Sequence, residues 1–166
     1  MSHELLRSHN NIVRLLGISW ASRRLKIEDQ PKQVPILLVE LASTMNNQPL
    51  TLELLIESSR HDPLNIGTKT KLLSDVASGL TALHALGVVH GDVKPSNILI
   101  FKDHLAMTAK ISDFGFSVTG DEELQAARGG TYLWNAPECL INAHGNLHPD
   151  RYKVTRDYYS LGLLIW

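Results

Sequence analysis

The chain is 166 residues long, and its 43% apolar and 20% charged residues are typical of one folded globular domain, which excludes a largely disordered protein. A formal net charge of −1 offers no basic surface for nucleic acid or for an anionic membrane, and no apolar run is long enough to span a bilayer, so we expect neither partner. The single cysteine, Cys139, excludes an internal disulfide and a cysteine-rich zinc site, and it favours a reducing compartment, the cytoplasm or alternatively the nucleus.

The N-terminal part of the chain predicts the end of a helix and then two strands. Residues 3–8 have the pattern of a last helical turn. A strand follows, whose apolar side chains we expect in a core: Ile12, Val13, Leu15, Leu16 and Ile18. Residues 22–33 are charged and polar and predict a solvated connection. Residues 35–42 are apolar and predict a second buried strand that runs into a linker.

Two helices follow this linker. Residues 43–49 are polar and suit a loop between two lobes, while residues 50–58 have helical composition. The strongest helical pattern covers residues 68–86, with Thr68 as the expected N-cap and Gly87 as the glycine that ends the helix. Its apolar residues recur with a period of 3.6, at Leu72, Leu73, Val76, Leu80 and Leu83.

The segment from residue 88 to residue 101 predicts a strand, a loop and a strand. Two short β-branched runs flank the loop, and we expect Pro95 to exclude helix from it. Asp92 and Asn97 are five residues apart on this loop, where a carboxylate and an amide can face a hydroxyl and a metal ion together. This is a geometry for phosphoryl transfer.

The remaining segments alternate short elements with polar loops. Residues 109–112 predict a strand that leads to Asp113, and residues 120–130 predict a mobile loop. Residues 138–142 predict a short helix. A last helix covers residues 155–166, with Tyr158, Leu161, Leu164 and Ile165 at core-like spacing.

Five motifs in this order resemble those of the eukaryotic protein kinases. They are His90-Gly91-Asp92 with Lys94 and Asn97, Asp113-Phe114-Gly115, Gly130-Thr131, Ala136-Pro137-Glu138, and Asp157-x-x-Ser160-x-Gly162. The resemblance runs from the end of the family's C helix to the start of its F helix. It implies an α+β, kinase-like, partial two-lobed fold, with part of the N-terminal lobe in residues 1–42, a hinge in residues 43–49 and part of the C-terminal lobe in residues 50–166.

The resemblance also implies roles for individual residues. Asp92 aligns the attacking hydroxyl and Lys94 neutralises charge on the transferred phosphoryl group, so these two are the expected catalytic residues. Asn97 and Asp113 supply the hard oxygen ligands that Mg²⁺ prefers. ATP is the expected nucleotide, and its adenine would meet four residues: Val39 as gatekeeper, the Glu40 carbonyl, the Ala42 amide and Leu99 as the floor. His90 and Phe114 are expected to act by packing.

The resemblance further predicts the substrate and the regulation. Thr131 precedes Ala136 by five residues, as does the threonine that contacts the catalytic acid in serine/threonine kinases, so we expect a protein substrate with a serine or threonine hydroxyl. Gly91 stands where many kinases have an arginine that pairs with a phosphorylated activation loop. We therefore expect that activation-loop phosphorylation is not required.

Other family features are missing from the sequence. It contains neither a G-x-G-x-x-G loop before residue 9 nor a strand lysine in a V-A-I-K context, and we expect a truncated domain that binds nucleotide weakly. Two alternatives to an active kinase remain open. One is a kinase-like scaffold without activity. The other is a small-molecule phosphotransferase of the aminoglycoside or choline kinase type, which Gly91 favours and Ala136-Pro137-Glu138 opposes.

Overall fold

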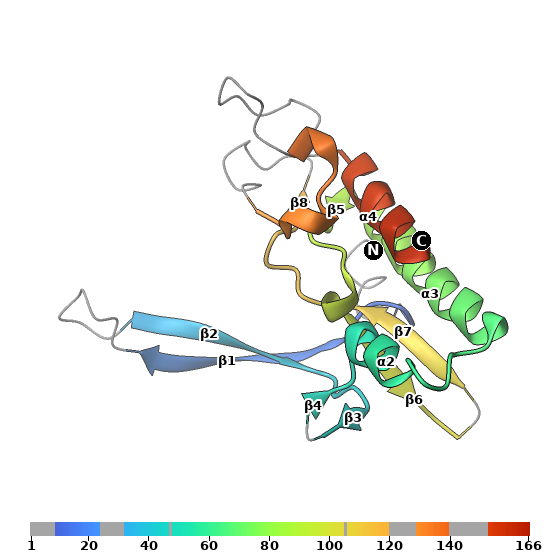
Figure 1. The fold of residues 1–166 in the computed structure, drawn as a ribbon. Coiled ribbons are helices and arrows are strands. Elements are labelled where there is room, and N and C mark those ends of the chain that lie inside the picture. Colours follow the sequence, from blue (N-terminus) through green and yellow to red (C-terminus); the bar gives the residue numbers. More distant parts are fainter. Residues whose placement is uncertain (1–8, 24–31, 47, 105, 120–128, 140–152) are drawn as a thin grey trace.

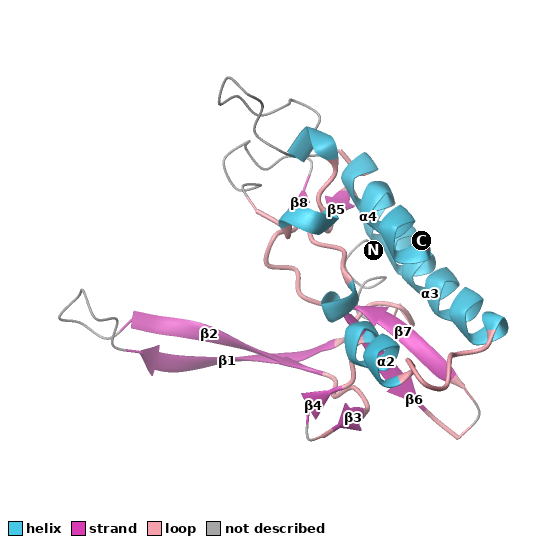
Figure 2. Cartoon of the chain, viewed as in Figure 1, coloured by secondary structure: helices cyan, strands magenta, loops and turns pink. Residues whose placement is uncertain are grey.

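The structure is a computed structural model that describes residues 9–23, 32–46, 48–104, 106–119, 129–139 and 153–166 (Figure 1). The helix end predicted at residues 3–8 lies outside these ranges, as do most of the predicted mobile loop and the end of the predicted helix at 138–142. Within the described residues, a long hairpin extends to one side of a body built from helices and short strands (Figure 2). No helix in this described part is long and apolar enough to cross a membrane.

The extended hairpin consists of β1 (Leu15–Arg23) and β2 (Lys32–Val39), which pair in antiparallel register from Leu15 opposite Val39 to Arg23 opposite Lys32. The prediction that both strands are buried is wrong. The exposed fractions are 59% for Leu16, 57% for Ile18 and 62% for Leu37, because each strand pairs only with the other among the described elements. Among the described elements, no further layer covers either face of the hairpin (Figure 1).

The residues just before β1 do belong to a core. Ile12 is 4% exposed and bridges Ile111 in parallel, while the Val13 amide donates to the Ile111 carbonyl at 2.9 Å. Asn11 closes the contact, since its carbonyl accepts from the Ile111 amide and its side chain donates to the Ala109 carbonyl. This segment, predicted as part of the first lobe, therefore packs with residues of the second.

The predicted polar linker forms a small hairpin of β3 (Thr44–Met45) and β4 (Gln48–Pro49). It is tied to β6 (Ile98–Lys102), the strand that follows the loop of Asp92 and Asn97. The Ser43 amide donates to the Ile100 carbonyl at 3.2 Å, and the Ile100 amide donates to the Leu50 carbonyl at 2.8 Å. The path of the chain into the helical part is thus set by backbone hydrogen bonds.

Both predicted helices are present. Thr51 is the N-cap of helix α2 (Leu52–Ser58), and its hydroxyl accepts from the Leu54 amide. Helix α3 (Ile66–His84) begins two residues earlier than predicted, and its N-cap is Asn65 instead of Thr68. The Asn65 side chain accepts from the Thr68 amide at 2.9 Å, so Thr68 is the donor in this cap. Gly87 has the positive φ, 71°, expected of the glycine that ends the helix.

The core lies between α3 and the hairpin of β6 (Ile98–Lys102) and β7 (Met107–Ile111). Four of the five α3 residues predicted to face inward are buried: Leu72, Val76, Leu80 and Leu83. Gly79 lets the helix approach closely, since a Cβ there would lie 2.6 Å from the Asn11 carbonyl oxygen and 2.8 Å from the Ile111 side chain. The 3.6-residue period therefore identified the buried face of α3 correctly.

Helix α4 (Thr155–Ile165) packs on α3 beside the loop segments (Figure 1). Its fully buried residues are polar: Arg156, Asp157 and Ser160. The predicted core positions Tyr158 and Ile165 are 53% and 63% exposed, so that part of the prediction is wrong. Because the face of α4 that is buried meets hydrogen-bonding loops, polar side chains occupy it.

Candidate active site

The loop that follows β5 (Val88–Val89) is held in place at both ends. β5 pairs with β8 (Val118–Thr119), and the loop ends in a short 3₁₀ turn, η1 (Pro95–Asn97), which leads into β6. The expectation that Pro95 excludes helix is wrong for this turn. Proline is tolerated at the first helical position because the missing N–H has no partner there.

Asp92 is the centre of a dense hydrogen-bond network. One carboxylate oxygen, Oδ2, accepts from Lys94 Nζ at 2.7 Å and from Asn97 Nδ2 at 2.9 Å. The other, Oδ1, accepts from the Thr131 amide and the Thr131 hydroxyl, both at 2.8 Å. Lys94 Nζ also donates to the Thr131 hydroxyl at 2.7 Å. Four residues predicted as site residues are therefore in direct contact, and a carboxylate so engaged has a fixed orientation.

The same contacts determine the ionisation of Asp92. Burial by itself raises the pKa of a carboxyl group, but the hydrogen bonds from Lys94 and Thr131 outweigh it and hold the pKa of Asp92 below its usual value. His90, on the same loop, is also buried, and burial lowers its pKa although Asp157 acts in the opposite direction. The loop thus combines an ionised Asp92 with a neutral His90 near neutral pH.

We expect the pKa of Asp92, and with it the pH below which this network loses its stabilising effect, to depend on Lys94. Since the folded-state pKa of Asp92 is lowered, its stabilisation is fully present above the unfolded pKa, about 3.9, and is lost as the pH falls through the folded value. Replacing Lys94 with methionine removes one of the two main groups that lower this pKa. Titration of the Asp92 carboxyl carbon by NMR is expected to show a higher pKa in K94M than in the unsubstituted chain, and an unchanged pKa would contradict the assigned contact.

Asp113 lies two residues after the end of β7, in a conformation that is rare for a residue with a side chain. Its φ is 63°, and its Oδ1 accepts from the Gly115 amide at 3.2 Å. The preceding residue connects it to the loop, because the amide and the hydroxyl of Ser112 both donate to the Asn97 carbonyl at 2.9 Å. Such strain is typical of functional sites.

The oxygen donors at this place fit Mg²⁺. Asn97 uses Nδ2 for its hydrogen bonds to Asp92, so Oδ1 is the atom that can bind a metal ion. Asp113 adds a carboxylate. The described residues contain no cluster of three acidic, histidine or cysteine ligands. Few protein ligands are expected where Mg²⁺ is held largely by phosphates and water.

A cavity of about 800 Å³ lies next to Asp113. Two of the residues predicted to face adenine, Val39 and Leu99, line it together with Asp113. The other lining residues are mostly apolar: Ile12, Val13, Leu15, Leu37, Leu83, Ser112, Phe114 and Gly115. A volume in this range and an apolar wall are typical of a pocket for a small ligand.

The other two predicted adenine contacts, Glu40 and Ala42, are not among the residues that line this cavity. The Glu40 side chain turns instead to Lys110, at 2.8 Å, and accepts from the Arg14 amide. Burial raises the pKa of Glu40, but the Lys110 and Arg14 contacts outweigh this and lower it overall. Ala42 is 4% exposed.

The two residues expected to act by packing differ in their burial. The rings of His90 and Phe114 meet edge to face, with centroids 5.2 Å apart. His90 is fully buried and its Nε2 lies 3.0 Å from the Ser112 carbonyl oxygen, whereas Phe114 is 40% exposed.

Cys139, on the 3₁₀ turn η3 (Pro137–Cys139), is partly buried, and burial raises its pKa, as expected of an unreactive thiol.

The support that α4 gives to the loop is not apparent from the sequence patterns. Asp157 is 1% exposed, and its carboxylate accepts from the amides of His90 and Gly91 at 2.8 and 2.9 Å. Its Oδ2 also lies 2.9 Å from His84 Nε2 on α3. The signal in the sequence is an acidic residue in the first turn of a helix on the face that should be apolar. The partners of Asp157 are 66 to 73 residues away in the sequence, so no local pattern identifies them.

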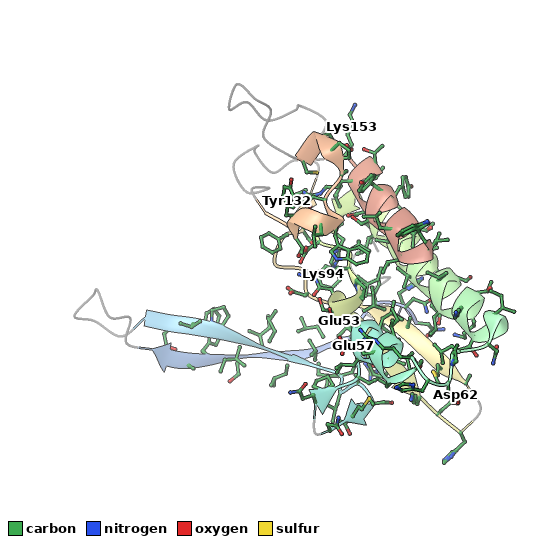
Figure 3. The ribbon with its side chains drawn as sticks, viewed as in Figure 1. Glu53, Glu57, Asp62, Lys94, Tyr132 and Lys153 are labelled. Atoms are coloured by element: carbon green, nitrogen blue, oxygen red, sulfur yellow. The ribbon has the colours of Figure 1, made fainter. Side chains whose placement is uncertain are left out.

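The segment that contains Thr131 also packs against α4. The 3₁₀ turn η2 (Tyr132–Trp134) follows Thr131 and packs against α4, where the Ser160 hydroxyl donates to the Trp134 carbonyl at 2.7 Å. Figure 3 shows Lys94 on the loop between Tyr132 and the residues of α2. Tyr132, which directly follows Thr131 in the chain, is 72% exposed.

Comparison with known proteins gives one family. The model for the protein kinase domain matches residues 2–166. A probable serine/threonine-protein kinase of Dictyostelium discoideum is 30% identical over 162 residues, which cover 97% of this chain and 8% of that protein. The cysteine-rich receptor-like protein kinase 6 of Oryza sativa subsp. japonica is 34% identical over 164 residues, which cover 95% of this chain and 20% of that protein.

A solved structure shows the same fold. One chain of the yeast RNA Pol II CTD kinase CTDK-1 complex matches with a TM-score of 0.66 and 23% identity, over 98% of this chain and 46% of that chain. At this identity the likeness concerns the fold alone. The chain thus spans less than half of the solved chain and at most a fifth of the two sequence relatives named above.

Proposed function

Because this chain belongs to the protein kinase family, we propose that it acts as a protein serine/threonine kinase domain, transferring the γ-phosphoryl group of ATP to a protein hydroxyl. The family match and the structural neighbour confirm the expected α+β, kinase-like fold. The observation that carries the proposal is the double hydrogen bond from Thr131 to Asp92, at 2.8 Å each. It supports the proposal because Thr131, the residue predicted to select serine and threonine substrates, bonds directly to the predicted catalytic carboxylate.

The proposed reaction assigns a task to each residue of the network. Asp92 accepts a hydrogen bond from the substrate hydroxyl and orients it for attack. Lys94, 2.7 Å from Asp92, offsets negative charge on the transferred group. Asn97 and Asp113 would hold Mg²⁺, which neutralises charge on the phosphates when it is bound. Most of the catalysis is then positioning and electrostatics, which a preformed hydrogen-bond network provides.

The proposed nucleotide site is the cavity beside Asp113. Val39 and Leu99 would pack against the adenine ring there, since both line the cavity. The Glu40 carbonyl and the Ala42 amide do not line the cavity, so the proposed contacts to adenine are those of Val39 and Leu99. The proposed substrate is a protein. The single cysteine favours a reducing compartment as the proposed location, the cytoplasm or alternatively the nucleus.

Phosphoryl transfer from labelled ATP to a generic basic protein, with and without Mg²⁺, tests this proposal. We expect transfer by the unsubstituted chain and roughly 100-fold less by D113A, because that variant loses a metal ligand. D62A, which removes an exposed carboxylate on the segment after α2, is the matched control and should keep full activity.

Three other results would contradict the proposal. A thermal shift with Mg·ATP but no transfer would favour the kinase-like scaffold. Transfer to an aminoglycoside or to choline, but to no protein, would favour a small-molecule phosphotransferase. Transfer that is equal in D113A and the unsubstituted chain would place the activity elsewhere.

A further inference from the structure

Arg156 is a buried cation that the proposed reaction does not use. It lies in the first turn of α4 and is 2% exposed. Its Nη2 donates to the Gly91 carbonyl at 2.6 Å, to the Gly129 carbonyl at 3.1 Å and to Asn135 Oδ1 at 3.3 Å. Burying a guanidinium is costly unless acceptors pair with its donors, so these three oxygens help to stabilise Arg156 in its buried position.

The acceptors of Arg156 come from two segments that meet at the catalytic carboxylate. Gly91 directly precedes Asp92, and Gly129 lies two residues before Thr131. Asp92 and Thr131 then bond to each other. Arg156 therefore joins the two segments immediately next to the contact on which the proposed mechanism depends.

Glycine is required at two positions around the guanidinium. Gly91 has a φ of 81°, and a Cβ there would lie 2.5 Å from the Phe116 carbonyl oxygen and 3.4 Å from Arg156 Nη1. Gly130 has a φ of 105°, and a Cβ there would lie 2.4 Å from Asn135 Oδ1 and 3.0 Å from Arg156 Nη2. A side chain at position 91 would thus clash with the Phe116 carbonyl oxygen, while the guanidinium would lie at ordinary contact distance from its Cβ.

We propose that Arg156 is a positioning residue, which holds the catalytic loop against residues 129–135 without a phosphate group. A phosphoryl group would have to displace protein oxygens to reach a guanidinium that is 2% exposed. The catalytic consequence rests on the proposed function, but the contact between the two segments does not.

Amide hydrogen exchange in the full chain tests the contact directly. In R156M, which keeps a long side chain but removes the donors, we expect the Thr131 amide to exchange at least about tenfold faster. The amides of Val76 and Leu80 in α3 should keep their rates. R60M removes an exposed guanidinium and is the matched control. Unchanged exchange at Thr131 in R156M overturns the proposal.

A second variant separates this local effect from a general loss of stability. If R156M also accelerates exchange in α3, R156K provides the test, because lysine keeps the charge but not the planar fork of donors. Faster exchange at Thr131 with unchanged α3 rates in R156K supports the proposal, and no change at Thr131 overturns it. Phosphatase treatment of the unsubstituted chain should leave the Thr131 rate unchanged, and acceleration there would show that a phosphate group holds the segments.

Kinetics test the catalytic consequence. We expect R156M, assayed well below its unfolding temperature, to lower kcat about tenfold while the KM for ATP stays within about twofold, because the cavity residues are not touched. Equal kcat values in R156M and the unsubstituted chain overturn the positioning role. If the unsubstituted chain transfers no phosphate at all, the proposed function fails while the exchange result still decides the contact.

Discussion

Replacing Asp92 with asparagine is expected to lower kcat for phosphoryl transfer by about 10² to 10⁴-fold, the range found when a positioned acid or base is removed. Asparagine has nearly the same shape but no charge. Its amide nitrogen would also face a donor, either Asn97 Nδ2 or the Thr131 amide, because all four groups around Asp92 donate to it. Initial rates of transfer from labelled ATP measure the effect.

The comparison needs a control for charge and for folding. D62N removes an exposed carboxylate and should leave kcat unchanged. Thermal unfolding of D92N shows whether the variant is folded at the assay temperature. A folded D92N that transfers phosphate within about threefold of the unsubstituted chain would remove Asp92 from the catalytic role that we assign to it.

Replacing Asp157 with alanine is expected to lower the free energy of unfolding by about 3–5 kcal/mol, the cost of removing one partner from a buried charged network. The carboxylate is 1% exposed, and without it the amides of His90 and Gly91 have no acceptor among the described residues. This places the largest expected stability effect in the first turn of α4, outside the apolar core. Urea-induced unfolding measures the loss.

Two further variants sharpen this test. D157N keeps one oxygen that can accept, so we expect a smaller loss than in D157A. D62A removes an exposed aspartate and should change the free energy of unfolding by less than about 0.5 kcal/mol. A loss below about 1 kcal/mol in D157A would show that water or a rearranged loop replaces the carboxylate.

The helices show where local sequence patterns suffice. The repeat of Leu72, Val76, Leu80 and Leu83 predicted both the helix and its buried face, because one side of α3 meets an apolar layer from Leu72 to Leu83. The N-cap was misplaced by three residues because Asn65 and Thr68 are both good caps, and only the backbone conformation distinguishes them.

The hairpin of β1 and β2 and the face of α4 show where local patterns fail. Apolar residues in a strand predict a covering layer, yet Ile18 and Leu37 lie on a hairpin without one among the described elements. On α4 the apolar period assigned Tyr158 and Ile165 to the core, whereas charged Arg156 and Asp157 are buried. Charged groups can be buried only if distant residues supply partners, and a periodic pattern carries no information about those partners.

The sequence by itself determined the family resemblance, the α+β class, and which residues of the loop between β5 and β6 are candidates for chemistry. These follow from residue types at short, fixed spacings within each motif. Such local spacings do not depend on how the rest of the chain packs. The resemblance implied that Thr131 contacts the carboxylate of Asp92, 39 residues away, and the tertiary structure shows both hydrogen bonds. Only the tertiary structure decided that Arg156 and Asp157 hold the loop in place from α4. The reason is physical: contacts across 39 to 67 residues are set by how helices and strands pack, and packing is a property of the whole chain.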